Sequence, residues 1–248
     1  MKRNLILAWR QLIIKGKLSV LQIFGITLGV TTSLLLCTYV NYHYSYDRFH
    51  NDLDQIYRVT SLQQQGDAIE HNALSPSGIA PLCESQIPGV VYSGRIARWI
   101  ANDVVLSHHE QVIRDNQMLF VEPSFFQIFS FRLKRGSYSS LAEPNTIFLT
   151  ESKAKALFGD EDPIEGEVMF ENFKPFQVKG IIEDPPVNSH LQFSCIMSLR
   201  TLQDWGFDIF QNQEMTIPYV YTYLKLDKKT NAAQVAEQIT NTVSTHQA

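Results

Sequence analysis

The sequence predicts an α+β fold in which one transmembrane helix precedes a domain of β-α-β elements with a smaller α/β subdomain inserted between them. Three observations lead to this prediction. Residues 18–40 contain no charged side chain. After them, short alternating apolar stretches are separated by turn residues and by helical patterns. Basic residues gather before the apolar run and acidic residues after it.

Residues 18–42 are the predicted transmembrane helix, because a bilayer core needs about 20 apolar helical residues and this run supplies them. Trp9 before the run and the tyrosines after it suit the two membrane interfaces. Three other interpretations stay open: a cleaved signal peptide, a lipoprotein signal ending at Cys37, and the buried core helix of a soluble protein. The length of the run argues against the first and third, and the bulky Leu36 before Cys37 argues against the second.

Charge is divided unevenly along the chain. The first 46 residues carry five basic and no acidic side chains, whereas the remainder carries 16 basic and 25 acidic ones. The positive-inside rule therefore places the N-terminus in the cytoplasm and the residues after about 42 outside it. The acidic body lacks the concentrated positive face that phosphate binding needs, so nucleic acid is not a predicted partner.

Gly25, Gly29 and Ser33 are spaced four residues apart within the run, so they share one helix face. Small residues at this spacing let a second helix approach closely, and the three are the predicted helix-packing site. The lipid bilayer is expected to surround the span. Residues 1–17 are predicted to form an amphipathic segment at the cytoplasmic surface; the alternative is that they are the frayed start of the spanning helix.

Strands and helices alternate beyond the span. Strands are predicted at residues 56–63, 90–99, 104–106, 112–114, 118–121, 147–150, 167–171, 176–182 and 219–226. Helices are predicted at residues 78–86, 123–129, 151–158 and 232–243. Thr150 caps the third helix and Gly159 ends it. The last strand and helix form a second β-α element that can pair with the first β-α-β unit.

The sequence contains no GxxxxGK[ST], HExxH or GxSxG motif. His108 and His109 are adjacent, and we expect their side chains on opposite sides of a strand or loop rather than on one metal ion. Asp160, Glu161 and Asp162 lack the pattern of a calcium loop and are expected to be solvated. The sequence therefore predicts no catalytic residue, no metal and no cofactor.

The chain has three cysteines and no CxxC spacing. Cys37 falls in the apolar run. Cys83 and Cys195 either pair in an oxidising compartment or remain two partly buried thiols.

Five short motifs follow one another in the order and spacing of a known family. They are SYDRFH at 45–50 with IYRV at 56–59, VEPSFFQIF at 121–129, LTES at 149–152 with ALFG at 156–159, DPIEG at 162–166, and VKGI at 178–181 with DPPVNSH at 184–190. With these motifs the chain resembles, from about residue 9 to residue 226, the MacB-like or FtsX-type ABC-transporter permeases of the Bacteroidetes type. Glu165 departs from the pattern, because the family motif closes directly on its glycine. Phe125, Phe126 and Phe129 are interpreted as core anchors rather than as a substrate site.

The resemblance implies a periplasmic MacB-like core domain at residues 43–248, with a porter-like part at 50–99 and 201–248 and an inserted subdomain at 100–200. It also implies a location in the bacterial inner membrane. The implied partners are a cytoplasmic ABC ATPase subunit, a second permease copy or homologous half and, as a further candidate, a periplasmic adaptor. Such permeases have further membrane helices after the outer domain, so the chain is expected to be a fragment or a truncated product.

The resulting hypothesis is the N-terminal part of a permease subunit that is not itself an enzyme. It would couple ATP hydrolysis by a separate ATPase to substrate export or release outside the cytoplasm. Tyr46, Asp47, Arg48 and Phe49, where the span meets the outer domain, are predicted to couple helix motion to domain motion; the alternative is a solvated juncture. Two other functions stay open: a single-pass anchored periplasmic binding or scaffold module, and an anchored envelope enzyme.

Overall fold

The computed structural model describes residues 6, 10, 17–65, 68–98, 103–207 and 218–247. The predicted amphipathic segment lies almost wholly outside these residues, and Trp9 is among those left out. Contacts divide the chain into two units, Met1–Asp47 and Arg48–Ala248.

The first unit contains the helix α2 (Lys17–Tyr44), whose 28 residues include the whole predicted span. At about 1.5 Å per residue, such a helix exceeds the roughly 30 Å of a bilayer core. Within Val20–Tyr44, an 18-residue window has a mean hydropathy of 1.9, so the helix is long and apolar enough to cross a membrane. The hydroxyls of Thr32 and Thr38 donate to the carbonyls of Leu28 and Leu34 at 2.8 and 2.9 Å, which satisfies these polar groups inside the helix.

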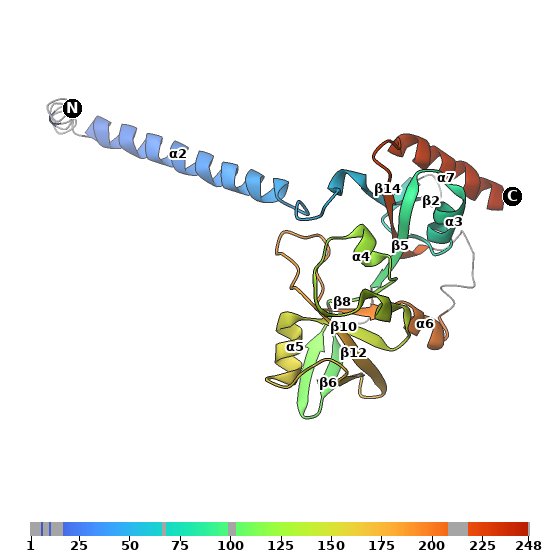
Figure 1. Ribbon diagram of the computed structural model, residues 1–248. Coiled ribbons are helices and arrows are strands. Elements are labelled where there is room, and N and C mark those ends of the chain that lie inside the picture. Colours follow the sequence, from blue (N-terminus) through green and yellow to red (C-terminus); the bar gives the residue numbers. More distant parts are fainter. Residues whose placement is uncertain are drawn as a thin grey trace. The chain divides into compact units, whose positions relative to one another are not determined.

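The second unit contains one large sheet, one small sheet and five α-helices among the described residues (Figure 1). The strands of the large sheet are β1 (Ile56–Val59), β4 (Ser75–Pro76), β5 (Val90–Arg98), β6 (Val104–His108), β7 (Gln111–Asp115), β8 (Met118–Val121), β9 (Leu133–Gly136), β10 (Thr146–Thr150), β11 (Glu167–Phe170), β12 (Lys174–Ile182), β13 (Cys195–Ser198) and β14 (Pro218–Leu226). The small sheet pairs β2 (Ser61–Gln65) with β3 (Ala68–Asn72). The helices are α3 (Ile79–Gln86), α4 (Phe125–Ile128), α5 (Glu151–Phe158), α6 (Arg200–Asp204) and α7 (Ala232–Gln247), with 3-10 turns η1 (Leu53–Gln55) and η2 (Tyr138–Ala142).

The large sheet runs in the order β1-β14-β5-β8-β13-β10-β12-β11-β6-β7, with β4 beside β14 and β9 beside β12. β14 lies antiparallel between β1 and β5, which confirms that the last β-α element pairs with the first β-α-β unit. The pairs β8–β13 and β10–β12 are parallel. All residues of β8, β13 and β10 are buried, so these three neighbouring strands form the centre of the sheet.

Three clusters of apolar side chains form the core. The first includes residues of α5 and α6, and the second surrounds α4. The third lies among α3, α7 and β14, which are close together in Figure 1. The boundaries at residues 99 and 200 that were predicted for an inserted subdomain stay a prediction.

Cys83 lies in the third cluster and Cys195 in the first, and both thiols are free and buried. Of the two alternatives left open by the sequence, the unpaired one is therefore found. Burial raises the pKa of Cys83 to about 12, so this thiol stays protonated and inert.

The predicted helix 151–158 agrees with α5, and Thr150 caps it by accepting a hydrogen bond from the Lys153 N–H at 3.3 Å. The predicted strand 56–63 is wrong as a single strand: β1 ends at Val59, and the chain then enters the small sheet as β2. The predicted helix 123–129 is shorter in the structure, where α4 is Phe125–Ile128. The sequence did not predict β13, although this strand lies between β8 and β10.

One buried ion pair ties α5 to the sheet. Asp115 at the end of β7 pairs with Lys153 of α5, and their side chains are 4% and 16% exposed. The carboxylate also accepts hydrogen bonds from Ser194 Oγ at 2.6 Å and from the Gln117 N–H at 2.7 Å. Burial alone would raise the pKa of Asp115, but the hydrogen bonds from Lys153, Ser194 and Gln117 together outweigh it and lower that pKa.

Asp115→Asn is expected to lower the free energy of unfolding at pH 7 by about 3 kcal/mol, because it leaves the Lys153 ammonium partly buried without its partner. The folded-state pKa of Asp115 lies below the unfolded one, so its stabilisation is complete above about pH 5 and is lost as pH falls through the folded-state pKa. Urea unfolding of the detergent-solubilised chain at a series of pH values measures both effects. Asp160→Asn, at an exposed position, is the matched control. If the free energy of unfolding falls equally steeply with decreasing pH in Asp115→Asn and in wild type, the stabilising role of the Asp115 carboxylate is contradicted.

Candidate functional site

The predicted helix-packing residues Gly25, Gly29 and Ser33 lie one turn apart on α2. A Cβ atom added at Gly25 or Gly29 would meet no other atom of the described chain within 4 Å. The neighbouring apolar side chains are exposed as well, Phe24 by 66% and Leu28 by 57%. No atom of the described chain covers the small-residue face at Gly25 and Gly29, and the role of the three residues stays a prediction.

The predicted juncture begins where α2 ends at Tyr44. The Ser45 N–H donates to the Asn41 carbonyl at 3.0 Å, and Ser45 Oγ donates to the Tyr42 carbonyl at 2.6 Å. The Tyr46 ring packs edge-on against Tyr42, with centroids 5.5 Å apart. Asp47 has φ of 59°, in the left-handed region that non-glycine residues seldom adopt. The apolar helix α2 thus ends in a defined turn.

The residues that follow are bound to the outer domain. Phe49 packs on Phe131, with ring centroids 5.4 Å apart. His50 is 5% exposed and lies against Phe131 and Phe129, at centroid distances of 5.1 and 5.3 Å. Its Nδ1 accepts a hydrogen bond from the Ser130 N–H at 3.1 Å. Arg48, in contrast, is exposed, so of the predicted juncture residues in this unit only Phe49 joins the core.

Asp52 adds ion pairs to this attachment. Its carboxylate lies 3.3 Å from Lys225 Nζ and 3.4 Å from Lys228 Nζ. The hydrogen bond from Lys225 is the largest influence that lowers the pKa of Asp52. His50 and Asp52 were not among the predicted site residues. His50 could have been found because it ends the SYDRFH motif, whereas no sequence signal distinguishes Asp52.

The family motifs contact one another in the folded domain. Asp184 of DPPVNSH accepts hydrogen bonds from Ser152 of LTES, through the N–H at 3.1 Å and through Oγ. His190 of the same motif has its Nε2 2.9 Å from the hydroxyl of Tyr223 in β14. The Tyr223 ring in turn packs on Phe129 of VEPSFFQIF, with centroids 5.0 Å apart. The motifs therefore hold distant segments together.

The three phenylalanines of VEPSFFQIF are core residues, as predicted. Phe125 and Phe129 are each 2% exposed, and Phe126 packs against the same cluster. They occupy the core rather than an open substrate cavity.

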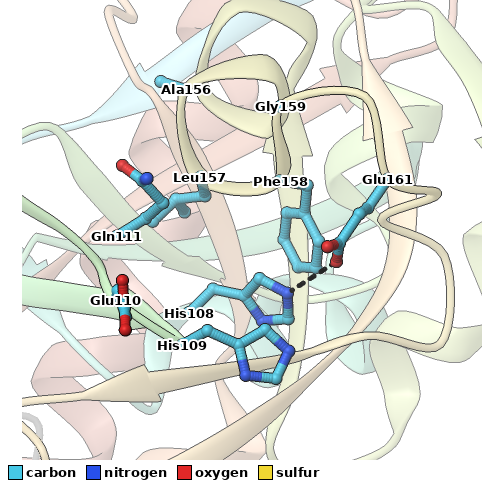
Figure 2. A pocket seen from close by; sticks show the side chains of 9 residues that line it. All are labelled: His108, His109, Glu110, Gln111, Ala156, Leu157, Phe158, Gly159 and Glu161. Atoms are coloured by element: carbon cyan, nitrogen blue, oxygen red, sulfur yellow. Dashed lines mark ion pairs between the residues drawn. The ribbon is translucent and has the colours of Figure 1, made fainter.

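The expectation that His108 and His109 point to opposite sides is wrong. Their ring centroids are 4.2 Å apart. One ligand atom each from His108, His109 and Glu161 lie within 4.8 Å of one another (Figure 2). Alternation applies only within a strand, and here β6 ends at His108 while His109 begins the turn with φ of 50°. Of the acidic residues next to Glu161, Asp162 is held by Arg135 at 2.8 Å and Asp160 is exposed.

Comparison with known proteins points to one family. A family model described as MacB-like periplasmic core domain matches residues 19–242. The chain shares its fold with a domain described as belonging to a permease protein from Porphyromonas gingivalis, at 20% identity and a TM-score of 0.66, covering 79% of this chain and 82% of that one. No curated protein matches the chain.

Two further solved structures share the fold at a lower level. The periplasmic region of MacB from Actinobacillus actinomycetemcomitans is 16% identical with a TM-score of 0.51, covering 69% of this chain and 73% of that one. The extracellular domain of the noncanonic ABC-type transporter YknZ from Gram-positive bacteria is 14% identical with a TM-score of 0.51, covering 71% of this chain and 85% of that one. Their descriptions place the first region in the periplasm and the second outside the cell.

Gly29→Leu is expected to weaken association of α2 with a neighbouring helix roughly tenfold, about 1.4 kcal/mol, because the added side chain separates the two backbones. Förster transfer between labelled copies of the full chain in lipid vesicles measures this association. Thr31→Leu is the matched control, since residues two apart on a helix point in nearly opposite directions. If the Gly29→Leu and Thr31→Leu variants associate equally well, the small-residue face is not the contact between helices.

Proposed function

The chain belongs to the family of the MacB-like periplasmic core domain of ABC-transporter permeases, and on that premise we propose that it is the N-terminal part of a permease subunit driven by a separate cytoplasmic ABC ATPase. One observation carries the proposal: the family match begins at residue 19, inside the candidate span, and continues to residue 242. The span and the outer domain are thus matched as one unit. The proposal assigns ATP hydrolysis to a separate subunit, and the 248 residues contain no P-loop motif.

The charge pattern gives the proposed orientation. The five basic residues before Asp47 stay in the cytoplasm and the acidic domain faces the periplasm, with the helix in the inner membrane. The family description, which names a periplasmic domain, agrees with this direction. The exposed apolar helix is solvated by lipid, and the face of Gly25, Gly29 and Ser33 meets a second permease copy or a homologous half.

The proposed mechanism is a mechanical relay. Movement of the membrane helix reaches the periplasm through the continuous chain at residues 46–52. Phe49 and His50 are packed into the aromatic core, so this end of the segment cannot move without the domain. Substrate is then expelled or released outside the cytoplasm, and a periplasmic adaptor is a further candidate partner.

An ABC ATPase is expected to co-purify with the full chain from its native membranes in a fixed ratio, because the relay requires a physical connection to the ATP-hydrolysing subunit. Mass spectrometry of the purified complex identifies the ATPase and gives the ratio. A monomeric chain without an ATPase would contradict the proposal and favour an anchored scaffold module.

Two insertion variants distinguish binding of the ATPase from transmission of motion to the periplasmic domain in the same complex. Gly-Ser-Gly between Asp47 and Arg48 is expected to leave the ATPase bound but to abolish ATP-dependent changes in hydrogen exchange at residues 49–59. The same insertion between Asn172 and Phe173, in the exposed turn between β11 and β12, should leave both properties intact. Loss of both properties in both variants would indicate misfolding.

A reporter fused after Gln247 tests the orientation. Alkaline phosphatase at this position is expected to be active and green fluorescent protein dark, because the positive-inside rule places the C-terminal side in the periplasm. Adding four lysines after Tyr46 is the control, since it should weaken or reverse this preference. A fluorescent, phosphatase-inactive pair of wild-type fusions would overturn the assignment.

A further inference from the structure

We propose that His108, His109 and Glu161 bind a divalent transition-metal ion, with Zn²⁺ as the best fit, at the tip of the β6–β7 hairpin. The three side chains each offer one ligand atom, and all these atoms lie within 4.8 Å of one another. Figure 2 shows both imidazoles and the carboxylate gathered beside Phe158. This binding site goes beyond the transport role and does not depend on it.

His108 is oriented as a metal ligand would be. Its Nδ1 lies 2.7 Å from the carbonyl oxygen of Glu167, which can only accept, so Nδ1 carries the proton. In the neutral ring the lone pair is then on Nε2, which lies 3.5 Å from the Glu161 carboxylate. An imidazole held by a backbone carbonyl through one nitrogen is the usual arrangement around a metal bound by the other.

The surroundings of His108 keep that nitrogen in place. The side chain is 12% exposed, and its ring stacks on Phe158 with centroids 3.9 Å apart and planes 30° apart. Its Nε2 is buried and makes no hydrogen bond in the described chain. A buried nitrogen with a fixed lone pair loses free energy unless a cation or a donor reaches it.

His109 and Glu161 complete the set from two different segments. The left-handed backbone of His109, φ 50°, turns its ring to the same side as His108. Glu161 follows α5 and its side chain is 70% exposed, so it can swing toward the imidazoles. Ligands about 2.0–2.2 Å from one Zn²⁺ lie roughly 3–3.5 Å apart, so a side-chain shift of about 1 Å closes the site.

The ligand types select the metal. Two imidazoles and one carboxylate suit Zn²⁺ and its neighbours in the first transition series, whereas Ca²⁺ and Mg²⁺ prefer oxygen ligands alone. Three protein ligands leave a fourth position open to the solvent-facing hollow lined by Glu110 and Gln111. The ion would cross-link the hairpin to the loop after α5.

Titration of the detergent-solubilised full chain with Co²⁺, followed by displacement with Zn²⁺, tests the proposal. The protein must carry no polyhistidine tag. One equivalent of Co²⁺ is expected to give visible absorption that Zn²⁺ removes. His109→Gln and Glu161→Gln should each weaken binding at least about tenfold, because each removes one of three ligands. His71→Gln, which removes an exposed histidine of β3, should change nothing.

Thermal unfolding distinguishes the loss of a metal ligand from the loss of the folded structure in these variants. Both site variants alter exposed or turn side chains and are expected to melt near the wild-type temperature without metal. Zn²⁺ should raise the melting temperature of wild type and His71→Gln but not of the site variants. Wild-type binding that survives both His109→Gln and Glu161→Gln, or no saturable binding below millimolar Zn²⁺, would overturn the proposal and leave an ordinary His108–Glu161 ion pair.

Discussion

The outer domain depends on the packing of aromatic rings from segments far apart in the sequence. Phe125 stacks on Phe131 with centroids 5.5 Å apart, Phe131 meets Phe193 edge-on at 4.9 Å, and Phe129 packs against Tyr223. Truncating one buried phenylalanine of this kind typically costs about 3–5 kcal/mol, a large part of a domain's stability. Because His50 lies in the same cluster, the chain leaving the candidate span is fixed by the core itself.

Ion pairs play a smaller part in this attachment. The partners of Asp52 include the largely exposed Lys228, and such pairs are screened by salt and lose side-chain entropy when they form. Contacts between phenylalanine rings are not screened by salt, and each buried ring contributes a large apolar area. Any relay from the membrane helix would therefore act mainly through Phe49 and His50.

Sequence reasoning succeeded where a local signal decides the structure. A threonine cap and a terminating glycine define α5, and alternating β-branched and aromatic residues define β14. It failed where contacts with other segments of the same chain decide the structure. The four residues of β13 form a central strand only because β8 and β10 flank them. Residues 56–63 show one alternating pattern but are divided between two sheets. At His109 the chain leaves the strand with a left-handed backbone, so the two imidazoles do not point to opposite sides as strand alternation predicts.

The order of strands places the anchored segment and the proposed metal site at opposite edges of the large sheet. β1, which follows the anchored segment, lies at one edge of the large sheet, and β7, which follows the histidine turn, lies at the other. Eight strands lie between them, and the fully buried β10 is one of these. A metal ion at the β6–β7 turn would restrain α5 and the far edge without touching the aromatic cluster. A relay could thus operate in a metal-free protein, and a metal could bind in a protein whose relay is interrupted, so neither result decides the other.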